Sequence, residues 1–122
     1  MLKPEEREQM ILARWIEDNY PTTEWTASAG GMRVRIGTAK KMKAMGYKKG
    51  TPDLMIYEPR GEWHGLIIEF KKTGGGVRSA DQKEKIAKLR ARGYCATFTD
   101  GLEEAKRIIK SYLAYNLISE KL

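Results

Sequence analysis

The sequence predicts an α/β or α+β domain in which a mixed β-sheet is flanked by helices, in the order αβββαβα. Two observations carry this prediction. Apolar residues recur at helical spacing near both ends of the chain, and two runs rich in Ile, Leu and aromatic residues lie between them. A chain of 122 residues is long enough to build one core, so no second domain is expected.

The N-terminal half predicts a helix followed by short, irregular elements. The helix covers residues 5–20, because Pro4 suits the first helical position and Pro21 ends the pattern. Its apolar face consists of Ile11, Leu12, Trp15 and Ile16. The next segments predict a short strand at 23–29, a second short strand or extended arm at 32–36, a basic helical turn at 40–46 and a loop at 47–52.

The C-terminal half has clearer patterns. Two strands are predicted at 53–58 and 65–72, joined by a turn that contains Pro and Gly. A helix begins at Ser79, whose hydroxyl forms an S-x-x-Q capping box with Gln82, and Gly93 ends it. A strand at 94–99 and a helix at 101–118 complete the prediction. The apolar face of this last helix consists of Leu102, Ala105, Ile108, Ile109, Tyr112 and Leu113.

The composition describes a soluble protein, with 41% hydrophobic and 32% charged residues. No apolar run approaches the roughly 18 residues that a membrane span requires, and the charged N-terminus does not resemble a secretory signal. The single cysteine, Cys95, cannot form an internal disulfide. We therefore expect a cytoplasmic protein.

The net charge of +7 is concentrated in one segment. Residues 26–52 contain no acid and seven basic residues: Arg33, Arg35, Lys40, Lys41, Lys43, Lys48 and Lys49. Such an asymmetry is typical of binding to a polyanion, because neutralised phosphates release their counterions. The alternative is a solvated loop that keeps the protein soluble.

Two acids and a lysine stand out in the central strands. Alternation places Glu69 and Lys71 on one face of their strand, and Phe70 on the opposite face toward a core, so the charged pair is expected to be presented rather than hidden. If paired residue numbers sum to 122, Asp53 lies opposite Glu69, whereas a sum of 121 turns Asp53 to the other face. Adjacent carboxylates repel each other, but a divalent cation such as Mg²⁺ reverses this effect, and Lys71 could help to position a nucleophile.

These residues resemble the PD-(D/E)xK nuclease signature, with Pro52-Asp53 followed by Glu69-Phe70-Lys71. The flanking sequences GYKKGTPDL, IIEFKK, SADQKEKIAKLRARGY and FTDGLEEAKRIIKSYL are similar to the virus-type replication-repair nuclease (VRR-NUC) domain, over residues 5 to 113. The resemblance implies a restriction-endonuclease-like fold, a single nuclease domain over 1–122 in a stand-alone, phage-like form, and hydrolysis of DNA with Mg²⁺ or Mn²⁺.

The resemblance also implies roles for individual residues. Asp53, Glu69 and the main-chain carbonyl of Phe70 would bind the metal, Lys71 would be the catalytic lysine, and Gln82 would belong to the active site. A glutamate of the first helix would approach the metal, and Glu5, Glu6 and Glu8 all lie near the required place. The phase of the helix favours Glu8, since it continues the inward face, while Glu5 and Glu6 also suit the helix dipole.

The expected function is a structure-selective DNA endonuclease, and the specific hypothesis is a homodimer that resolves four-way (Holliday) junctions in the cytosol of a bacterium or phage-infected host. Two symmetric cuts require two sites, which a two-fold dimer supplies. Four apolar residues of the last helix could form its interface or ordinary core: Leu113, Tyr115, Leu117 and Ile118. The alternatives are a non-catalytic DNA-binding module, or a nuclease that acts on flaps or other branched or linear DNA.

Overall fold

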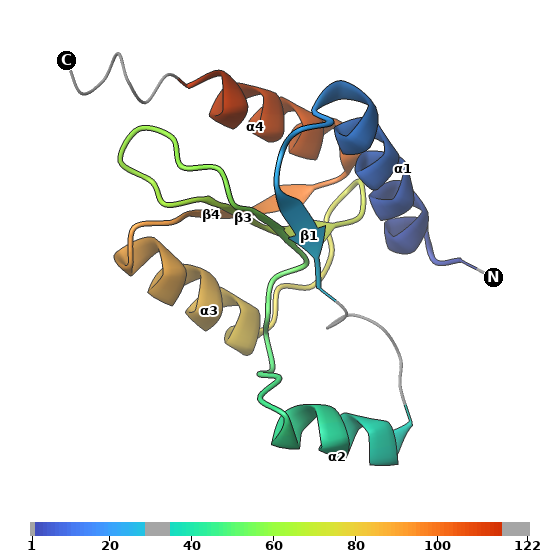
Figure 1. Ribbon diagram of the computed structural model, residues 1–122. Helices are drawn as coiled ribbons and strands as arrows, with labels where there is room; N and C mark the ends of the chain where they lie inside the picture. Colours follow the sequence, from blue (N-terminus) through green and yellow to red (C-terminus); the bar gives the residue numbers. More distant parts are fainter. Residues whose placement is uncertain (1, 29–34, 116–122) are drawn as a thin grey trace.

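The computed structural model describes residues 2–28 and 35–115 (Figure 1). Within these ranges the elements follow the order αβαββαβα. They are α1 (Pro4–Asn19), β1 (Trp25–Ala27), α2 (Ile36–Ala44), β2 (Leu54–Ile56), β3 (Leu66–Lys71), α3 (Ala80–Ala91), β4 (Cys95–Asp100) and α4 (Leu102–Ala114). None of these helices is long and apolar enough to cross a membrane.

The four strands form one mixed sheet in the spatial order β1-β2-β3-β4. The β1–β2 and β2–β3 pairs are antiparallel, whereas β3 and β4 are parallel. A parallel pair requires a crossover connection, which α3 supplies. Leu54 pairs with Ile68 and Ile56 with Leu66, so paired residue numbers sum to 122. This register places Asp53 opposite Glu69 and confirms one of the two alternatives that the sequence left open.

The helices cover both faces of the sheet, with α1 and α4 on one face and α3 on the other (Figure 1). The larger core lies under α1 and α4 and consists of Leu12, Ile16, Leu54, Ile56, Leu66, Ile68, Phe70, Ala105, Ile109 and Tyr112. A smaller core lies under α3 and consists of Ile67, Ile86 and Ala96. This arrangement confirms the predicted α/β class.

Strand β3 is buried along its whole length. Alternation predicts that Glu69 and Lys71 stand on a presented face, but their relative exposures are only 3% and 6%. That expectation was wrong because α3 follows β3 directly and packs back across the same face. A strand paired in parallel beneath a crossover helix is commonly covered on both faces. The charged residues therefore lie inside the molecule.

The middle of the chain differs most from the sequence-based prediction. Helix α2 begins at Ile36, where an arm or strand was expected, and it adds an element between β1 and β2 that the predicted order lacks. Residues 32–34 of the predicted arm, which include Arg33, lie outside the described residues. Helix α4 ends at Ala114, and Leu117 and Ile118 of the predicted helix also lie outside them. The capping box of Ser79 and Gln82 is confirmed.

Candidate active site

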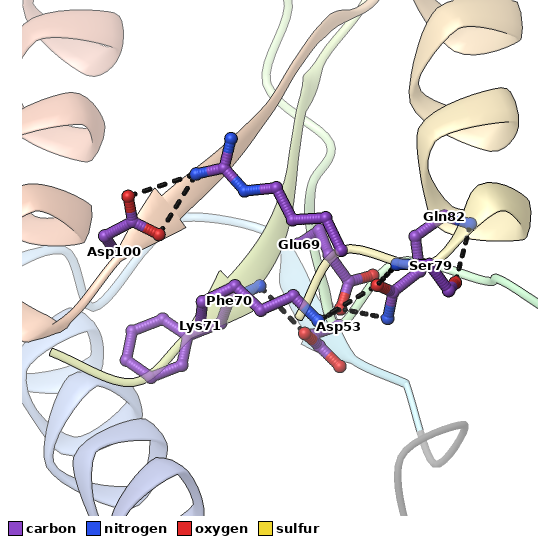
Figure 2. Close-up of polar contacts among 8 residues, drawn as sticks. Asp53, Glu69, Phe70, Lys71, Ser79, Gln82 and Asp100 are labelled. Atoms are coloured by element: carbon purple, nitrogen blue, oxygen red, sulfur yellow. Dashed lines mark hydrogen bonds and ion pairs between the residues drawn. The ribbon is translucent and has the colours of Figure 1, made fainter. Parts of the chain in front are cut away.

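Asp53 and Glu69 lie together where β2 begins and β3 ends, at the same ends of the two inner strands of the sheet. Both residues are buried, at 9% and 3% relative exposure. Asp53 Oδ2 accepts a hydrogen bond from the backbone N–H of Phe70, with an N···O distance of 2.8 Å (Figure 2). The Phe70 ring lies in the core, so its peptide unit is the part that adjoins the two carboxyl groups. Register and backbone bonding thus hold Asp53 against the end of β3.

Gln82 joins the carboxyl pair to the lysine (Figure 2). Its Oε1 accepts from Lys71 Nζ at 3.0 Å, and its Nε2 donates to Glu69 Oε2 at 3.1 Å. Lys71 Nζ also lies 3.8 Å from Glu69 Oε2. The capping box fixes the amide, because Gln82 Oε1 also accepts from the backbone N–H of Ser79 at 3.0 Å. The structure therefore brings Asp53, Glu69, Lys71 and Gln82 into one buried cluster.

Glu69 carries a strongly perturbed carboxyl group. Burial, followed by a hydrogen bond to Asp53 and the charge of Asp53, raises the pKa of Glu69 to about 9. Lys71 opposes this shift, but burial outweighs it. We therefore expect Glu69 to be protonated at neutral pH in the metal-free protein. A pair that retains a proton at this pH is suited to exchange that proton for a cation.

The glutamates of α1 lie in different environments. Glu8 Oε1 accepts from the Thr73 hydroxyl at 2.6 Å and from the backbone N–H of Leu102 at 3.0 Å, and its Oε2 accepts from the Thr73 N–H at 3.2 Å. The Thr73 hydroxyl and these backbone donors lower the pKa of Glu8. Glu8 thus ties α1 to the turn after β3 and to the first residue of α4, and the structure does not bring it to the carboxyl pair.

Glu5, one turn earlier, lies toward the charged cluster. Burial raises the pKa of Glu5, the charge of Asp53 raises it further, and Lys71 lowers it. Glu6 instead accepts a hydrogen bond from the backbone N–H of Lys3 and caps its own helix. The same stripe of α1 contains Glu5, Glu8 and Leu12, so helical phase selects two glutamates. Phase does not show that Glu8 binds Thr73 while Glu5 lies near Asp53 and Lys71.

A family model of the VRR-NUC domain matches residues 3–101. The chain belongs to the VRR-NUC family. A solved structure described as a VRR_NUC domain protein superimposes with a TM-score of 0.81 at 30% sequence identity, covering 95% of this chain and 93% of the other. No curated protein matches the chain. Membership implies nuclease function and DNA binding, and it confirms the family that the sequence motifs indicate.

The VRR-NUC cluster offers oxygen ligands to a divalent cation. In residues 2–28 and 35–115, no three His, Cys, Asp or Glu side chains form a complete ligand group. Two neighbouring carboxyl groups nevertheless fit Mg²⁺, which usually binds one or two carboxylates and keeps several waters. The residues present are therefore compatible with a cation whose remaining positions are open.

The described basic residues of segment 26–52 in this VRR-NUC chain lie outside the buried cluster. Arg35, Lys40, Lys41, Lys43, Lys48 and Lys49 are all exposed. Helix α2 projects away from the sheet and the other helices (Figure 1), and the segment that follows it leads to Asp53. Lys49 Nζ lies 3.4 Å from Asp81 Oδ2 at the start of α3. The basic segment thus begins on a projecting helix and ends beside the cluster.

No sequence pattern predicts the ion pair between Arg78 and Asp100, which lies beside the site. Arg78 Nη2 lies 3.1 Å from Asp100 Oδ1 and 3.0 Å from Asp100 Oδ2, and its guanidinium stacks 4.6 Å from the centre of the Phe98 ring. Asp100 pairs with Lys71 across the parallel β3–β4 ladder. The pair joins the loop before α3 to the end of β4. Only the β3–β4 register reveals that this acid neighbours the lysine.

Proposed function

We propose that this protein is a metal-dependent DNA endonuclease that hydrolyses phosphodiester bonds. The observation that carries the proposal is the buried cluster in which Gln82 links Lys71 to Glu69, with Asp53 beside them. Burial of two neighbouring carboxyl groups and an ammonium group costs stability, and strongly perturbed groups of this kind cluster at functional sites. Membership of the VRR-NUC family supports a hydrolytic role for the cluster.

Asp53, Glu69 and the main-chain carbonyl of Phe70 would hold Mg²⁺ or Mn²⁺. When bound, such an ion neutralises charge that develops on the phosphate and makes a bound water more acidic. Asp53 is already oriented for this role, because the Phe70 N–H holds one of its oxygens. Glu69 must first release its proton, and the neighbouring Lys71 favours the charged carboxylate.

Lys71 is the cationic side chain of the cluster. Gln82 Oε1 accepts one of its hydrogen bonds and leaves the other N–H groups of the ammonium available to a phosphate oxygen or an attacking water. A fixed ammonium stabilises the transition state more effectively than a mobile one, because its orientation needs no reorganisation during the reaction. We assign Lys71 to positioning the nucleophile and Gln82 to holding Lys71.

The exposed basic segment supports binding to the DNA backbone. Lys40, Lys41 and Lys43 on α2 can contact phosphates, which attract cations without regard to sequence. Lys48 and Lys49 lie on the segment that enters the site, so a strand that contacts them would approach Asp53. We also propose, from the family resemblance and the need for two symmetric cuts, a homodimer that resolves four-way junctions.

Two alternatives remain distinct from this proposal. The chain could bind DNA without cutting it, or it could cut flaps or linear DNA rather than junctions. The packing of Tyr115 against Trp63, with ring centres 5.6 Å apart, favours an intrachain role for this part of α4 over the proposed dimer interface. The cluster of Lys71, Glu69 and Gln82 favours the enzyme over the binding module.

The Glu69→Ala variant tests the proposal. Cleavage should be lost while DNA binding survives, and Glu62→Ala, in the exposed loop between β2 and β3, is the matched control. The assay compares duplex, single-stranded, flap and four-way junction DNA with Mg²⁺ and with Mn²⁺. A folded wild-type protein that binds DNA but cuts none of these substrates with either ion would support the binding module.

A further inference from the structure

The loop between β3 and α3 is fixed at both ends. At its start, Thr73 donates two hydrogen bonds to Glu8. At its end, Arg78 binds Asp100 with both N···O distances near 3 Å, and Ser79 caps α3. Between these anchors lie Gly74, Gly75, Gly76 and Val77. Anchoring on both sides gives the tip of the loop a defined position despite its glycines.

The tip of this loop lies against the proposed catalytic lysine. A β-carbon placed on Gly76 would lie 3.4 Å from Cδ of Lys71. This distance is an ordinary van der Waals contact, so the Gly76 backbone lies beside the Lys71 side chain. The next residue, Val77, is attached directly to the segment that borders the site. A DNA strand bound at Lys71 would therefore lie close to this part of the loop.

Val77 is 87% exposed, the largest exposed fraction among the large hydrophobic residues that the structure describes. A single exposed apolar residue is common on protein surfaces, so exposure alone carries no argument. The position of Val77 is informative because it extends from an anchored loop beside Lys71. A valine offers nothing to a phosphate, but it can pack against the face of a base.

We propose that Val77 packs against an unstacked base at a discontinuity in duplex DNA and thereby selects branched substrates. This inference rests on the proposed nuclease function and concerns the substrate of the same site. DNA-binding proteins insert apolar side chains between base steps and partly unstack them. A continuous duplex covers its base faces by stacking, whereas a branch point exposes them. The contact with Val77 therefore forms only when the branch lies next to the bond that is cut.

Val77→Thr tests the proposal because threonine keeps the shape of valine but has a hydroxyl in place of one methyl group. We expect it to lower the ratio of four-way junction to linear duplex cleavage by roughly three- to ten-fold, and Val77→Ile should retain the wild-type ratio. The matched control is Ile11→Thr, on the exposed side of α1, which should also keep the wild-type ratio. An unchanged ratio in Val77→Thr would overturn the proposal.

A binding experiment separates this inference from the nuclease proposal. Junctions carrying 2-aminopurine next to the branch are titrated with the Glu69→Ala protein, with and without Val77→Thr. Fluorescence should rise on binding when Val77 is present, because contact with Val77 keeps the base at the branch out of its stack. The rise should be several-fold smaller with threonine. Equal rises would contradict the role of Val77. This readout needs no cleavage, so it decides the inference even if the wild-type protein cuts no DNA.

Discussion

Gln82 uses both ends of its side-chain amide inside the charged cluster. Its oxygen accepts from Ser79 and Lys71, and its nitrogen donates to Glu69. The sequence suggests two roles for this residue, a helix cap and a member of the site, and the hydrogen bonds show that one rotamer serves as both. Capping fixes the amide before substrate arrives, so Lys71 has a partner in the free protein.

Stability of the metal-free protein should depend on the protonation of Glu69. Its pKa is about 9 in the folded protein and near the ordinary value of 4.5 when unfolded, so the folded state binds more protons between these values. The free energy of unfolding contributed by this group therefore falls as pH rises through that window. We expect Glu69→Gln to remove this fall.

The measurement is urea unfolding in the presence of a chelator at about pH 5 and about pH 8.5. The variant should gain stability over wild type mainly at the higher pH, and Glu62→Gln is the exposed control. Identical pH dependence of wild type and Glu69→Gln would show that Glu69 is ionised in the folded, metal-free protein.

Glu5 and Glu8 should respond differently to the same substitution. Glu8→Gln weakens the charged hydrogen bonds to Thr73 and Leu102, so we expect the thermal midpoint to fall by about a few degrees. Glu5→Gln removes a carboxyl group that lies near Asp53 and interacts with its charge. We therefore expect a roughly ten-fold higher metal concentration for half-maximal cleavage, with little change in the thermal midpoint. The exposed Glu17→Gln variant is the control for both. The reverse pattern would identify Glu8 as the metal-side glutamate.

At the scale of elements, α2 is unusual because it is a helix without a packed face. Of its nine residues, all of which the structure describes, none is buried. Helices of this length are marginal in water, and the charges of Lys40 and Lys43 repel each other three residues apart. Phosphates placed along α2 would remove that repulsion. DNA is therefore expected to stabilise this helix as well as to be held by it.

Charge reversal on α2 should weaken binding to every form of DNA. We expect the triple variant Lys40→Glu, Lys41→Glu and Lys43→Glu to lose about ten-fold or more in affinity, with a smaller dependence on salt, because fewer counterions are released. Fluorescence anisotropy over a series of salt concentrations measures both effects. The control reverses three exposed charges on α1 and α4: Arg14, Arg107 and Lys110. Equal affinities for the two triple variants would show that α2 only contributes solubility.

The sequence predicts the helices and strands whose apolar residues recur at regular spacing. It does not predict the features that depend on tertiary contacts. Strand alternation and one of two registers are enough to place Asp53 opposite Glu69. Burial of Lys71 is not predictable from its own strand, because α3 covers it from a later part of the chain. The role of Glu8 depends on Thr73, which lies 65 positions away. Local patterns cannot show such long-range partners.

At the scale of the whole molecule, the charged cluster lies at one end of the inner strands of the sheet. The end of β3, the start of β2 and the N-terminus of α3 meet there, and the basic segment leads into the same end (Figures 1 and 2). One molecule presents one such cluster in its described residues. Symmetric cleavage of a junction therefore requires a second copy or two successive binding events.

The dimer proposal predicts paired cuts. Light scattering at micromolar protein should give twice the monomer mass, and mapping on a four-way junction should show cuts placed symmetrically about the branch. Linear duplex of the same sequence is the control substrate. A monomer that nicks junctions no faster than linear duplex would contradict the junction-resolvase proposal. The proposal of a general nuclease would still hold.

The cluster residues lie close together in sequence as well as in space. Asp53, Glu69, Lys71 and Gln82 all belong to a stretch of about thirty residues that forms a hairpin and the first turn of the following helix. Closing such a short loop costs little chain entropy, so these contacts can form early in folding. Glu5 and Glu8 must arrive from far upstream. We therefore expect the proposed catalytic cluster to form before α1 packs against the sheet, and the glutamates of α1 to reach their positions last.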